Sequence, residues 1–445
     1  MSTQSIAAAE KPTHVRYLVV LMLFILTAVN YADRATLSIA GPSVSKELGI
    51  DTVTMGYVFS AFGWSYVAAQ LPGGWLLDRF GSKAVYTFSL ALWSVFTALQ
   101  GTVGFFVGGA AVALLFALRF LVGIAEGPSF PGNARIVAAW FPAKERGLAS
   151  AIFNSAQYFS TVLFAPFMAW ITHTYGWRAV FYVMGVLGVI LAVVWVRLLF
   201  SPKDHPWINK AEYDHIADGG GLVDMDQAGK SGAPGSGPKL AYIKQLLGSR
   251  MLVGIYVGQY CITTLTYFFL TWFPVYLVQQ RGMSILKAGI YASLPAIAGF
   301  LGGVLGGLIS DFMLRRGFSL TASRKTPIVC GMLLSMSMIA CNYVDAEWMV
   351  VGFMSLAFFG KGVGALGWAV VSDTSPKEIS GLSGGLFNTF GNTAGITTPI
   401  VIGYLVAGSG SFSSALVYVG LNALAAILCY LVVVGEIKRF ELKPV

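Results

Sequence analysis

Long apolar runs separated by short polar loops repeat along almost the whole chain. Each run holds about 20 residues or more, the length that an α-helix needs to cross ~30 Å of hydrocarbon. Twelve runs can be distinguished, at residues 17–40, 54–77, 84–104, 110–138, 147–170, 178–200, 251–278, 286–309, 326–344, 347–372, 381–406 and 412–435. The pattern predicts an all-α membrane protein with 12 transmembrane helices.

One long polar stretch, residues 201–248, divides the runs into two sets of six. It contains the segment SGAPGSGP at 231–238, whose composition is typical of a flexible linker, and we expect one short helix in it at Asn209–Ala217. The predicted organisation is an N-terminal six-helix bundle (1–200), a cytoplasmic linker (201–248) and a C-terminal six-helix bundle (249–445).

The charge pattern supports a membrane protein and sets its orientation. Only 11% of the 445 residues are charged, less than half of the ~25% usual in soluble domains. Of the 29 Lys and Arg residues, 21 lie at the termini and in the loops after even-numbered runs, and four lie in the alternate loops. This bias predicts that both termini are cytoplasmic, and it explains the net charge of +9 without a nucleic-acid partner.

The two halves of the chain repeat each other. Asp78, in GWLLDRFG after the second run, has a counterpart in Asp311 after the eighth run, 233 residues later. Glu145 and Glu378, which open runs five and eleven, have the same offset, and a Phe-Asn pair follows in each of these runs. Parallel repeats of this kind predict two pseudo-symmetric bundles with a site between them.

Few ionisable residues lie inside the runs, and such residues are costly enough in a membrane to be functional candidates. Arg34 is the first candidate for substrate, because its planar guanidinium matches a carboxylate in two hydrogen bonds. Asp33 and Glu126 are assigned to proton coupling, since burial and nearby cations act on a carboxyl in opposite directions. Arg119, seven residues before Glu126 on the same helix face, is expected to position Glu126 or gate the site.

Lys361 is the cation that lies deep inside a run of the C-terminal half, in 347–372. It precedes Trp368 by seven residues, so we expect both on about the same helix face. A ligand with two carboxylates could balance the excess of cations. The hypothesis is that Arg34 binds one carboxylate and Lys361 the other, across the two repeats.

Several motifs carry a family resemblance that extends over essentially the whole chain. GWLLDRFGSK at 74–83 is similar to the loop motif G-x-x-x-D-R-x-G-x-[RK] of the major facilitator superfamily. NYADR at 30–34, RFLVGIAEGPSFPGNARIVAAWFP at 119–142, FNSAQ at 153–157 and SDTSPKE at 372–378 resemble its anion:cation symporter branch. Within that branch the chain most resembles the bacterial permeases for hexarates such as D-glucarate and galactarate.

The resemblance implies further site residues and a location in the bacterial inner membrane. Five neutral side chains match positions that line the sugar-acid site of the family: Tyr31, Tyr66, Gln157, Trp368 and Asn388. Asn392, one turn beyond Asn388, is a weaker candidate. The resemblance also implies a cytoplasmic gate in which Asp78 is held by neighbouring groups, with Arg79, Arg135 and Arg146 as the arginines concerned.

The sequence therefore predicts a proton-coupled symporter that imports a hexarate by alternating access, works as a monomer and needs no cofactor. The four cysteines lie in apolar runs without metal-ligand spacing, so no metal site is expected. Enzyme chemistry is not expected either, because the G-x-S-x-G match at 381–385 lies in a membrane span and lacks a histidine partner. Two alternatives stay open: a sodium-coupled or exporting organic-anion carrier, and a non-transporting sugar-acid sensor in the membrane.

Overall fold

A computed structural model describes residues 11–224, 240–376 and 379–442, and in these residues the chain forms helices without any strand. Part of the predicted linker, 225–239, and the repeat marker Lys377-Glu378 lie outside the described residues. The N-terminal half contains α1 (Val15–Leu48), α2 (Thr52–Phe80), α3 (Ser82–Gln100), η1 (Gly101–Phe105), α4 (Gly108–Glu126), α5 (Ser129–Trp140), α6 (Arg146–Tyr175), α7 (Trp177–Leu198) and α8 (Lys210–Asp218).

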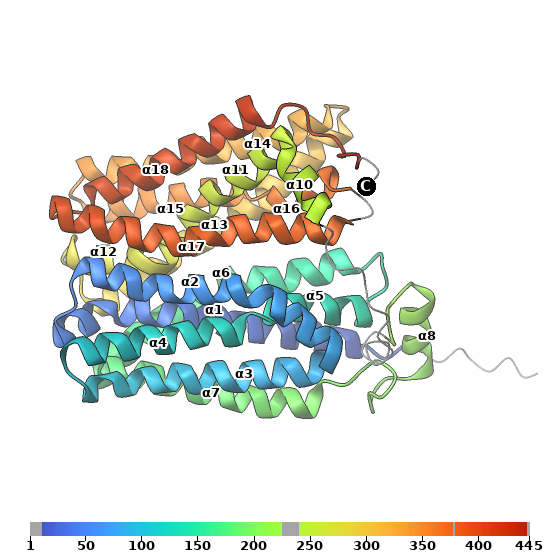
Figure 1. Cartoon of the computed structure of the whole chain (residues 1–445), viewed down its shortest axis with the longest axis horizontal. Helices are drawn as coiled ribbons and strands as arrows, with labels where there is room; N and C mark the ends of the chain where they lie inside the picture. Colours follow the sequence, from blue (N-terminus) through green and yellow to red (C-terminus); the bar gives the residue numbers. More distant parts are fainter. Residues whose placement is uncertain (1–10, 225–239, 377–378, 443–445) are drawn as a thin grey trace, which may run out of the picture.

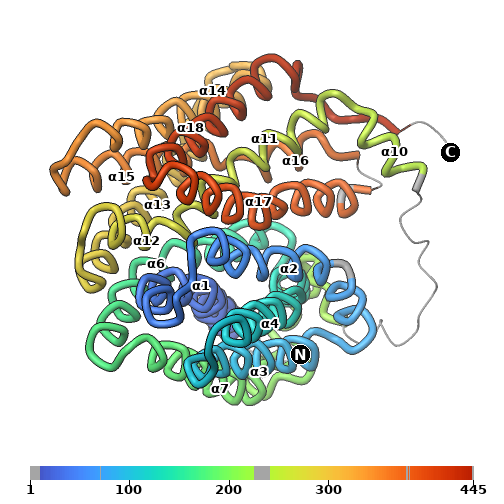
Figure 2. The backbone as a smooth tube through the Cα atoms, turned by 60° about the vertical axis from the view of Figure 1, so that its left-hand side comes forward, coloured from blue at the N-terminus to red at the C-terminus, as the bar shows by residue number. Residues whose placement is uncertain are grey.

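The C-terminal half is built from α10 (Leu240–Gly248), α11 (Arg250–Tyr267), the π-helical turn η2 (Phe268–Trp272), α12 (Phe273–Gln279), α13 (Ile285–Arg315), α14 (Leu320–Ser335), η3 (Met336–Tyr343), α15 (Glu347–Val363), α16 (Gly367–Thr374), α17 (Ser380–Ser409), α18 (Ser413–Leu428) and the π-helical turn η5 (Cys429–Val433). Figure 1 shows the two halves as two layers of roughly aligned long helices, and Figure 2 shows the same division from another side. The all-helical architecture that the hydropathy pattern predicts is confirmed.

The internal repeat is visible in the helix bounds. Helix α2 begins at Thr52 and α13 at Ile285, 233 residues later. Helices α6 and α17 begin at Arg146 and Ser380 and both run for 30 residues, with an offset of 234. These offsets agree with the sequence markers, so equivalent helices of the two halves have equivalent lengths.

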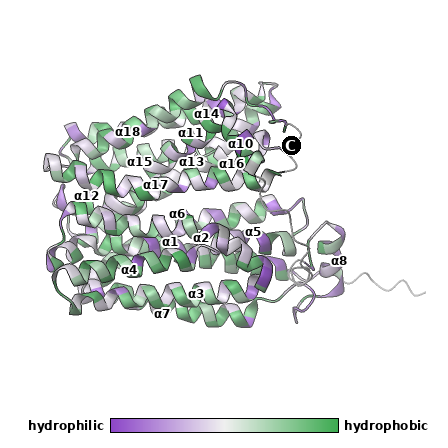
Figure 3. Ribbon diagram, in the orientation of Figure 1, coloured by the Kyte–Doolittle hydropathy of each residue, from purple (hydrophilic) through white to green (hydrophobic). Residues whose placement is uncertain are grey.

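Ten helical segments of the described chain are long and apolar enough, by length and composition, to cross a membrane. Helices α2 and α6 are not among the ten, although their 29 and 30 residues give them the length. Both lie against the C-terminal half, α2 beside α17 and α6 beside α13. Hydrophobic residues predominate along the long helices (Figure 3), and many large hydrophobic side chains on them are exposed, as expected for a surface that contacts lipid. The 12-span count and the cytoplasmic termini stay predictions.

The two halves approach most closely at the end of the bundle that is remote from α8. A Cβ added to Gly56 of α2 would lie 2.6 Å from the carbonyl oxygen of Pro399 on α17, and one on Gly63 would lie 2.7 Å from that of Gly395. Ser38 donates to the Thr271 carbonyl at 2.7 Å across the same boundary. Glycine is required at these positions because the two backbones are nearly in contact.

The first part of the predicted linker packs against the N-terminal half. The predicted short helix is found as α8, and its residue Glu212 is fully buried. The Glu212 carboxylate accepts hydrogen bonds from the backbone N–H groups of Val15 and Arg16 and pairs with the Arg16 guanidinium at 3.0 Å. A carboxylate at a helix N-terminus is favourable, so Glu212 attaches α8 to the start of α1.

A second contact of α8 involves Glu145, in the loop before α6. Glu145 bonds His215 of α8 at 3.0 Å and Arg16 of α1 at 3.1 Å. Partial burial raises the pKa of Glu145, but the hydrogen bonds with His215 and Arg16 outweigh it and leave the pKa below its usual value. The linker segment around α8 therefore belongs structurally with the N-terminal helices.

Candidate functional site

Four buried ionisable residues of the N-terminal half, Asp33, Arg34, Arg119 and Glu126, form one cluster between α1 and α4. Arg34 Nε donates to Glu126 Oε2 at 2.8 Å, and the two side chains are 5% and 0% exposed. Glu126 is the last residue of α4, where the helix breaks before α5 begins at Ser129. The pair is thus held at an interruption of a membrane helix, away from lipid.

Three aromatic rings enclose the Arg34 guanidinium. Its Cζ lies 4.8 Å from the ring centroid of Tyr31, 4.7 Å from that of Phe62 and 4.5 Å from that of Tyr66. Phe62 and Tyr66 are one turn apart on α2, so both face α1. Arg34 Nη2 has no hydrogen-bond partner among the described residues. The guanidinium is therefore oriented by its neighbours and keeps donors that an anion can use.

Arg119 connects α4 to the backbone of α1. Its Nη1 donates to the carbonyl of Asp33 at 3.4 Å and its Nη2 to the carbonyl of Arg34 at 3.3 Å. Since Arg119 is buried, these bonds hold the segment of α1 that carries the ionisable residues. The sequence could place Arg119 near Glu126, but it could not show that the guanidinium bonds to backbone carbonyls.

Asp33 points away from Arg34, as neighbouring positions on a helix require. Both of its carboxyl oxygens are buried and make no hydrogen bond in the described structure. Glu126, Arg119 and the indole of Trp93 are its electrostatic neighbours. A carboxyl in this setting is costly to keep ionised, which is the property that a proton-carrying group needs.

The C-terminal half faces this cluster with a chain of neutral polar groups. The Tyr267 hydroxyl donates to Asn392 Oδ1 at 3.0 Å, and Asn392 Nδ2 donates to Asn388 Oδ1 at 3.0 Å. Asn388 Nδ2 then donates to Gln70 Oε1 of α2 at 2.9 Å, which crosses from one half to the other. Tyr267 is close enough to Arg34 for the two to interact electrostatically. This series of hydrogen bonds therefore links the two halves beside the Arg34 guanidinium.

Sequence reasoning did not select Tyr267 or Gln70. Gln70 lies one turn beyond Tyr66 on α2, and that spacing could have identified it. Tyr267 ends α11 directly before the π-helical turn Phe268–Trp272, a type of distortion that occurs mostly at functional sites. Pro274 is the sequence signal for that distortion, because a proline cannot donate to the carbonyl four residues earlier, here that of Leu270 within the turn.

Lys361 lies near the end of α15, and its ammonium contacts rings rather than acids. Nζ is 5.6 Å from the ring centroid of Tyr158 and 5.2 Å from that of Phe358. The expectation that Lys361 and Trp368 share a helix face assumed one continuous helix. It is wrong, because α15 ends at Val363 and α16 begins only at Gly367. Trp368 is 57% exposed and packs edge-on against Phe387.

Gln157 lies on α6 next to Tyr158 and is half-buried. The part of the chain that the structure describes gives its side chain no hydrogen bond. Tyr31 and Asn388 are also half-buried, whereas Tyr66 is buried. The predicted neutral residues thus come from α1, α2, α6, α16 and α17. Among them, Asn388 bonds across the boundary between the halves.

The residues predicted to form a gate lie at the end of the bundle that carries α8. Arg135 of α5 donates to Asp78 at 2.5 Å, but Asp78 is 73% exposed, so this ion pair contributes little. Arg79 instead stacks on Trp75 and Phe80. Arg146 does not reach Asp78: it donates to the carbonyls of Ala138, Phe141 and Gly220 and thereby holds the linker segment.

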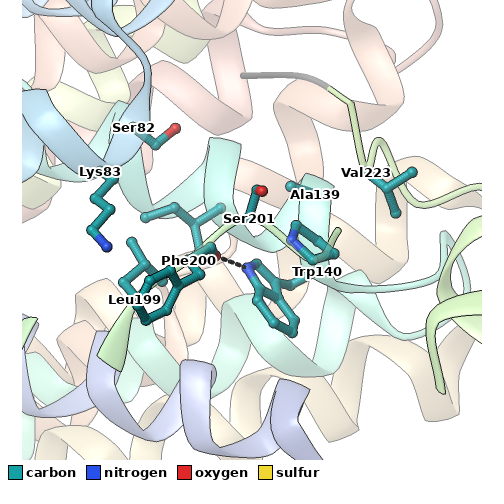
Figure 4. A pocket seen from close by; sticks show the side chains of 10 residues that line it. Ser82, Lys83, Ala139, Trp140, Leu199, Phe200, Ser201 and Val223 are labelled. Carbon is teal, nitrogen blue, oxygen red and sulfur yellow. Dashed lines mark hydrogen bonds between the residues drawn. The ribbon is translucent and has the colours of Figure 1, made fainter. Parts of the chain in front are cut away.

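Two hollows lie outside the charge cluster, one of about 20 Å³ and one of about 640 Å³. Figure 4 shows the first, a space of about 20 Å³ between the start of α3, α5 and the turn after α7, where Trp140 Nε1 donates to the Phe200 carbonyl at 3.2 Å. Room for about one water is too little for an organic substrate. The second lies at the end of the C-terminal half, around Arg250 and Arg439. Neither hollow includes a residue of the cluster.

Comparison with known proteins agrees with the architecture. A family model described as "Major Facilitator Superfamily" matches residues 23–323. The chain is 65% identical to the "Probable galactarate/D-glucarate transporter GudP" of Bacillus subtilis, over 99% of this chain and 96% of that protein. It is 43% identical to the "D-galactonate transporter" of Escherichia coli, over 97% of this chain and 98% of that protein. Among solved structures, a D-xylose-proton symporter aligns with a TM-score of 0.68 at 16% identity, over 95% and 98% of the two chains.

Proposed function

The chain belongs to the Major Facilitator Superfamily, and from this we propose that it is a proton-coupled symporter that imports a hexarate such as galactarate or D-glucarate. Its relatives are transporters rather than enzymes, and those at 59–65% identity over essentially the full chain are named for these two diacids. The protein spans a membrane several times. In this proposal the membrane is the bacterial inner membrane, with 12 spans and both termini in the cytoplasm.

The observation that carries the proposal is the position of Arg34. It is a buried guanidinium at the boundary between the halves, with one nitrogen bonded to Glu126 and another without a partner. A sugar-acid carboxylate binds such a fork more strongly than a neutral ligand does. Tyr31, Tyr66, Gln157 and Asn388 supply hydroxyl and amide groups for the sugar chain, and exposed Trp368 joins the site when the halves close.

Proton coupling follows from the Arg34–Glu126 pair. When Glu126 takes up a proton, it no longer competes as an anion for Arg34, and a substrate carboxylate binds there more tightly. When Glu126 releases the proton, it pairs with Arg34 again and the substrate leaves. By thermodynamic reciprocity, substrate binding must then favour protonation to the same extent. Asp33, buried and without a hydrogen bond, is the second proton carrier in this scheme, and Arg119 keeps it in place.

Alternating access requires the halves to close at one end and then at the other. The close approaches at Gly56 and Gly63 join them at the end remote from α8, so this conformation matches the one that faces the cytoplasm in the proposed topology. In the opposite conformation, Asp78, Arg79, Arg135 and Arg146 act at the cytoplasmic end as its gate. Each molecule contains both halves, so a monomer suffices for this cycle.

Purified protein in liposomes tests the proposal. An inward pH gradient, acidic outside, is expected to drive accumulation of labelled galactarate above its external concentration, and an added uncoupler should abolish it. A sodium gradient at equal pH serves as the control. Accumulation driven by sodium instead would support the alternative coupling, and binding without any accumulation would support a sensor.

A further inference from the structure

Lys361 is a buried cation of the C-terminal half that pairs with no acid. It is 6% exposed, and the described residues give its ammonium neither an ion pair nor a hydrogen bond. Arg34 and Arg119 are equally buried but bond a carboxylate and two backbone carbonyls. An ammonium can donate three hydrogen bonds, so Lys361 keeps its full donor capacity inside the fold.

The packing of α15 against α13 directs Lys361 toward the other half. A Cβ on Gly362 would lie 2.2 Å from the Gly299 carbonyl, and one on Gly302 would lie 2.1 Å from the Phe359 carbonyl. The two backbones therefore touch, and no side chain fits between them. The Lys361 ammonium lies instead over Tyr158, which belongs to α6 of the N-terminal half.

Tyr158 also connects Lys361 to the Arg34 site. Its hydroxyl interacts electrostatically with Tyr31, and Tyr31 stacks on the Arg34 guanidinium at 4.8 Å. Arg34 of the N-terminal half and Lys361 of the C-terminal half each lie against a tyrosine ring of the N-terminal half, Tyr31 and Tyr158. Both cations border the same boundary, and each retains donors for an anion.

Resting on the function proposed above, we propose that Lys361 binds the second carboxylate of the substrate and makes the carrier selective for diacids over monoacids. A hexarate has carboxylates at both ends of its chain, so it engages Arg34 and Lys361 together. An aldonate such as galactonate has one carboxylate and engages only Arg34. The diacid also links the two halves directly, which favours the closed conformation that transport needs.

The test compares galactarate with galactonate in proteoliposomes that contain wild-type protein, Lys361→Gln or Lys361→Arg. Loss of one charge-assisted contact should raise the KM for galactarate about 10- to 100-fold in Lys361→Gln, while the KM for galactonate changes less than about 3-fold. Lys361→Arg keeps the cation and should keep the preference for the diacid. Lys325→Gln makes the same chemical change on neighbouring α14 and should alter neither KM.

Ligand-induced stabilisation of the detergent-purified variants gives a readout that does not depend on transport rate. Galactarate should raise the unfolding temperature of wild-type protein more than galactonate does, and this difference should vanish in Lys361→Gln. An equal effect of Lys361→Gln on both ligands would overturn the diacid assignment while leaving the proposed function intact. Failure of wild-type protein to take up any hexarate would overturn both.

Discussion

Corresponding helices of the two halves are interrupted within the membrane, but their charges are partnered differently. Helix α4 ends at Glu126, which pairs with Arg34, and Arg119 of the same helix bonds the backbone of α1. Helix α15 ends two residues after Lys361, whose ammonium lies near the rings of Tyr158 and Phe358 and forms no ion pair with the residues that the structure describes. The N-terminal half thus holds a balanced cluster, whereas the C-terminal half holds one cation that is open to a ligand.

This difference indicates a division of labour between the repeats. The net charge of a buried ion pair changes only when a proton or an ion binds to it. This property suits the cluster of the N-terminal half to coupling proton binding to substrate binding. A cation without a partner is suited to recognition, because an arriving carboxylate restores its interactions. Four substitutions can break or sharpen this comparison, and their expected effects decrease from the first to the last.

Glu126→Gln should have the largest effect, because it removes the proton-binding group of the pair and leaves a neutral acceptor for Arg34. We expect accumulation of galactarate driven by a pH gradient to fall about 100-fold, while exchange of internal for external substrate continues. Glu47→Gln alters an ion pair with Arg178 and a hydrogen bond from the Trp177 indole, both outside the cluster, and should leave accumulation unchanged. Normal gradient-driven uptake by Glu126→Gln would show that coupling lies elsewhere.

Arg119→Leu tests whether Arg119 stabilises the folded N-terminal half by bonding the backbone of α1. Loss of its bonds to the carbonyls of residues 33 and 34 should lower the free energy of unfolding by about 2–3 kcal/mol. Thermal unfolding in detergent measures this effect. Arg197→Leu, at the exposed last turn of α7, is the control and should unfold like wild-type protein. Unaltered stability of Arg119→Leu would contradict the bracing role.

Lys361→Met, unlike Arg119→Leu, should not lower the stability of the ligand-free protein. Since Lys361 forms no ion pair with the described residues, replacing its buried charge by an apolar side chain should leave stability unchanged or raise it by about 1 kcal/mol. The same thermal assay without substrate is sufficient. A loss of stability as large as that of Arg119→Leu would mean that the two halves do not differ in this respect.

The smallest effect is expected outside the membrane, where the short helix α8 packs against the N-terminal half. Glu145 has a lowered pKa through its bonds with His215 and Arg16. Ionised Glu145 therefore stabilises the docking of α8 at any pH above the usual pKa of a glutamate. This contribution is lost as the pH falls through the lowered pKa of Glu145. Because Glu145 is 30% exposed, it amounts to less than about 1 kcal/mol.

Hydrogen exchange of the α8 amides, followed from neutral to acidic pH, measures this contribution. In wild-type protein the protection of α8 should decrease toward acid, and in Glu145→Gln it should be lower at neutral pH and vary less. Glu436→Gln serves as the control, because its exposed partner Lys438 lies in the other half. Equal pH dependence in wild-type protein and Glu145→Gln would exclude Glu145 as the titrating group.

The sequence by itself determined the helical spans, the repeat and the identity of the ionisable residues inside the membrane. Hydropathy is a property of consecutive residues, so runs of about 20 apolar positions can be recognised without knowledge of packing. The same holds for the offset of 233–234 residues that α2, α13, α6 and α17 show. The short helix α8 was also predictable, since Asn209 provides its N-cap.

Only the tertiary structure decided which of these residues meet. Arg34 and Glu126 are 92 positions apart in sequence, and no local rule predicts that their side chains bond. The contacts of Tyr158 with Lys361, of Tyr267 with Asn392 and of Arg146 with the linker carbonyls arise in the same way. The break between α15 and α16 likewise removed the face that Lys361 and Trp368 were expected to share. The physical reason is that contacts between helices depend on their rotation and depth in the bundle, which the packing of the whole chain sets.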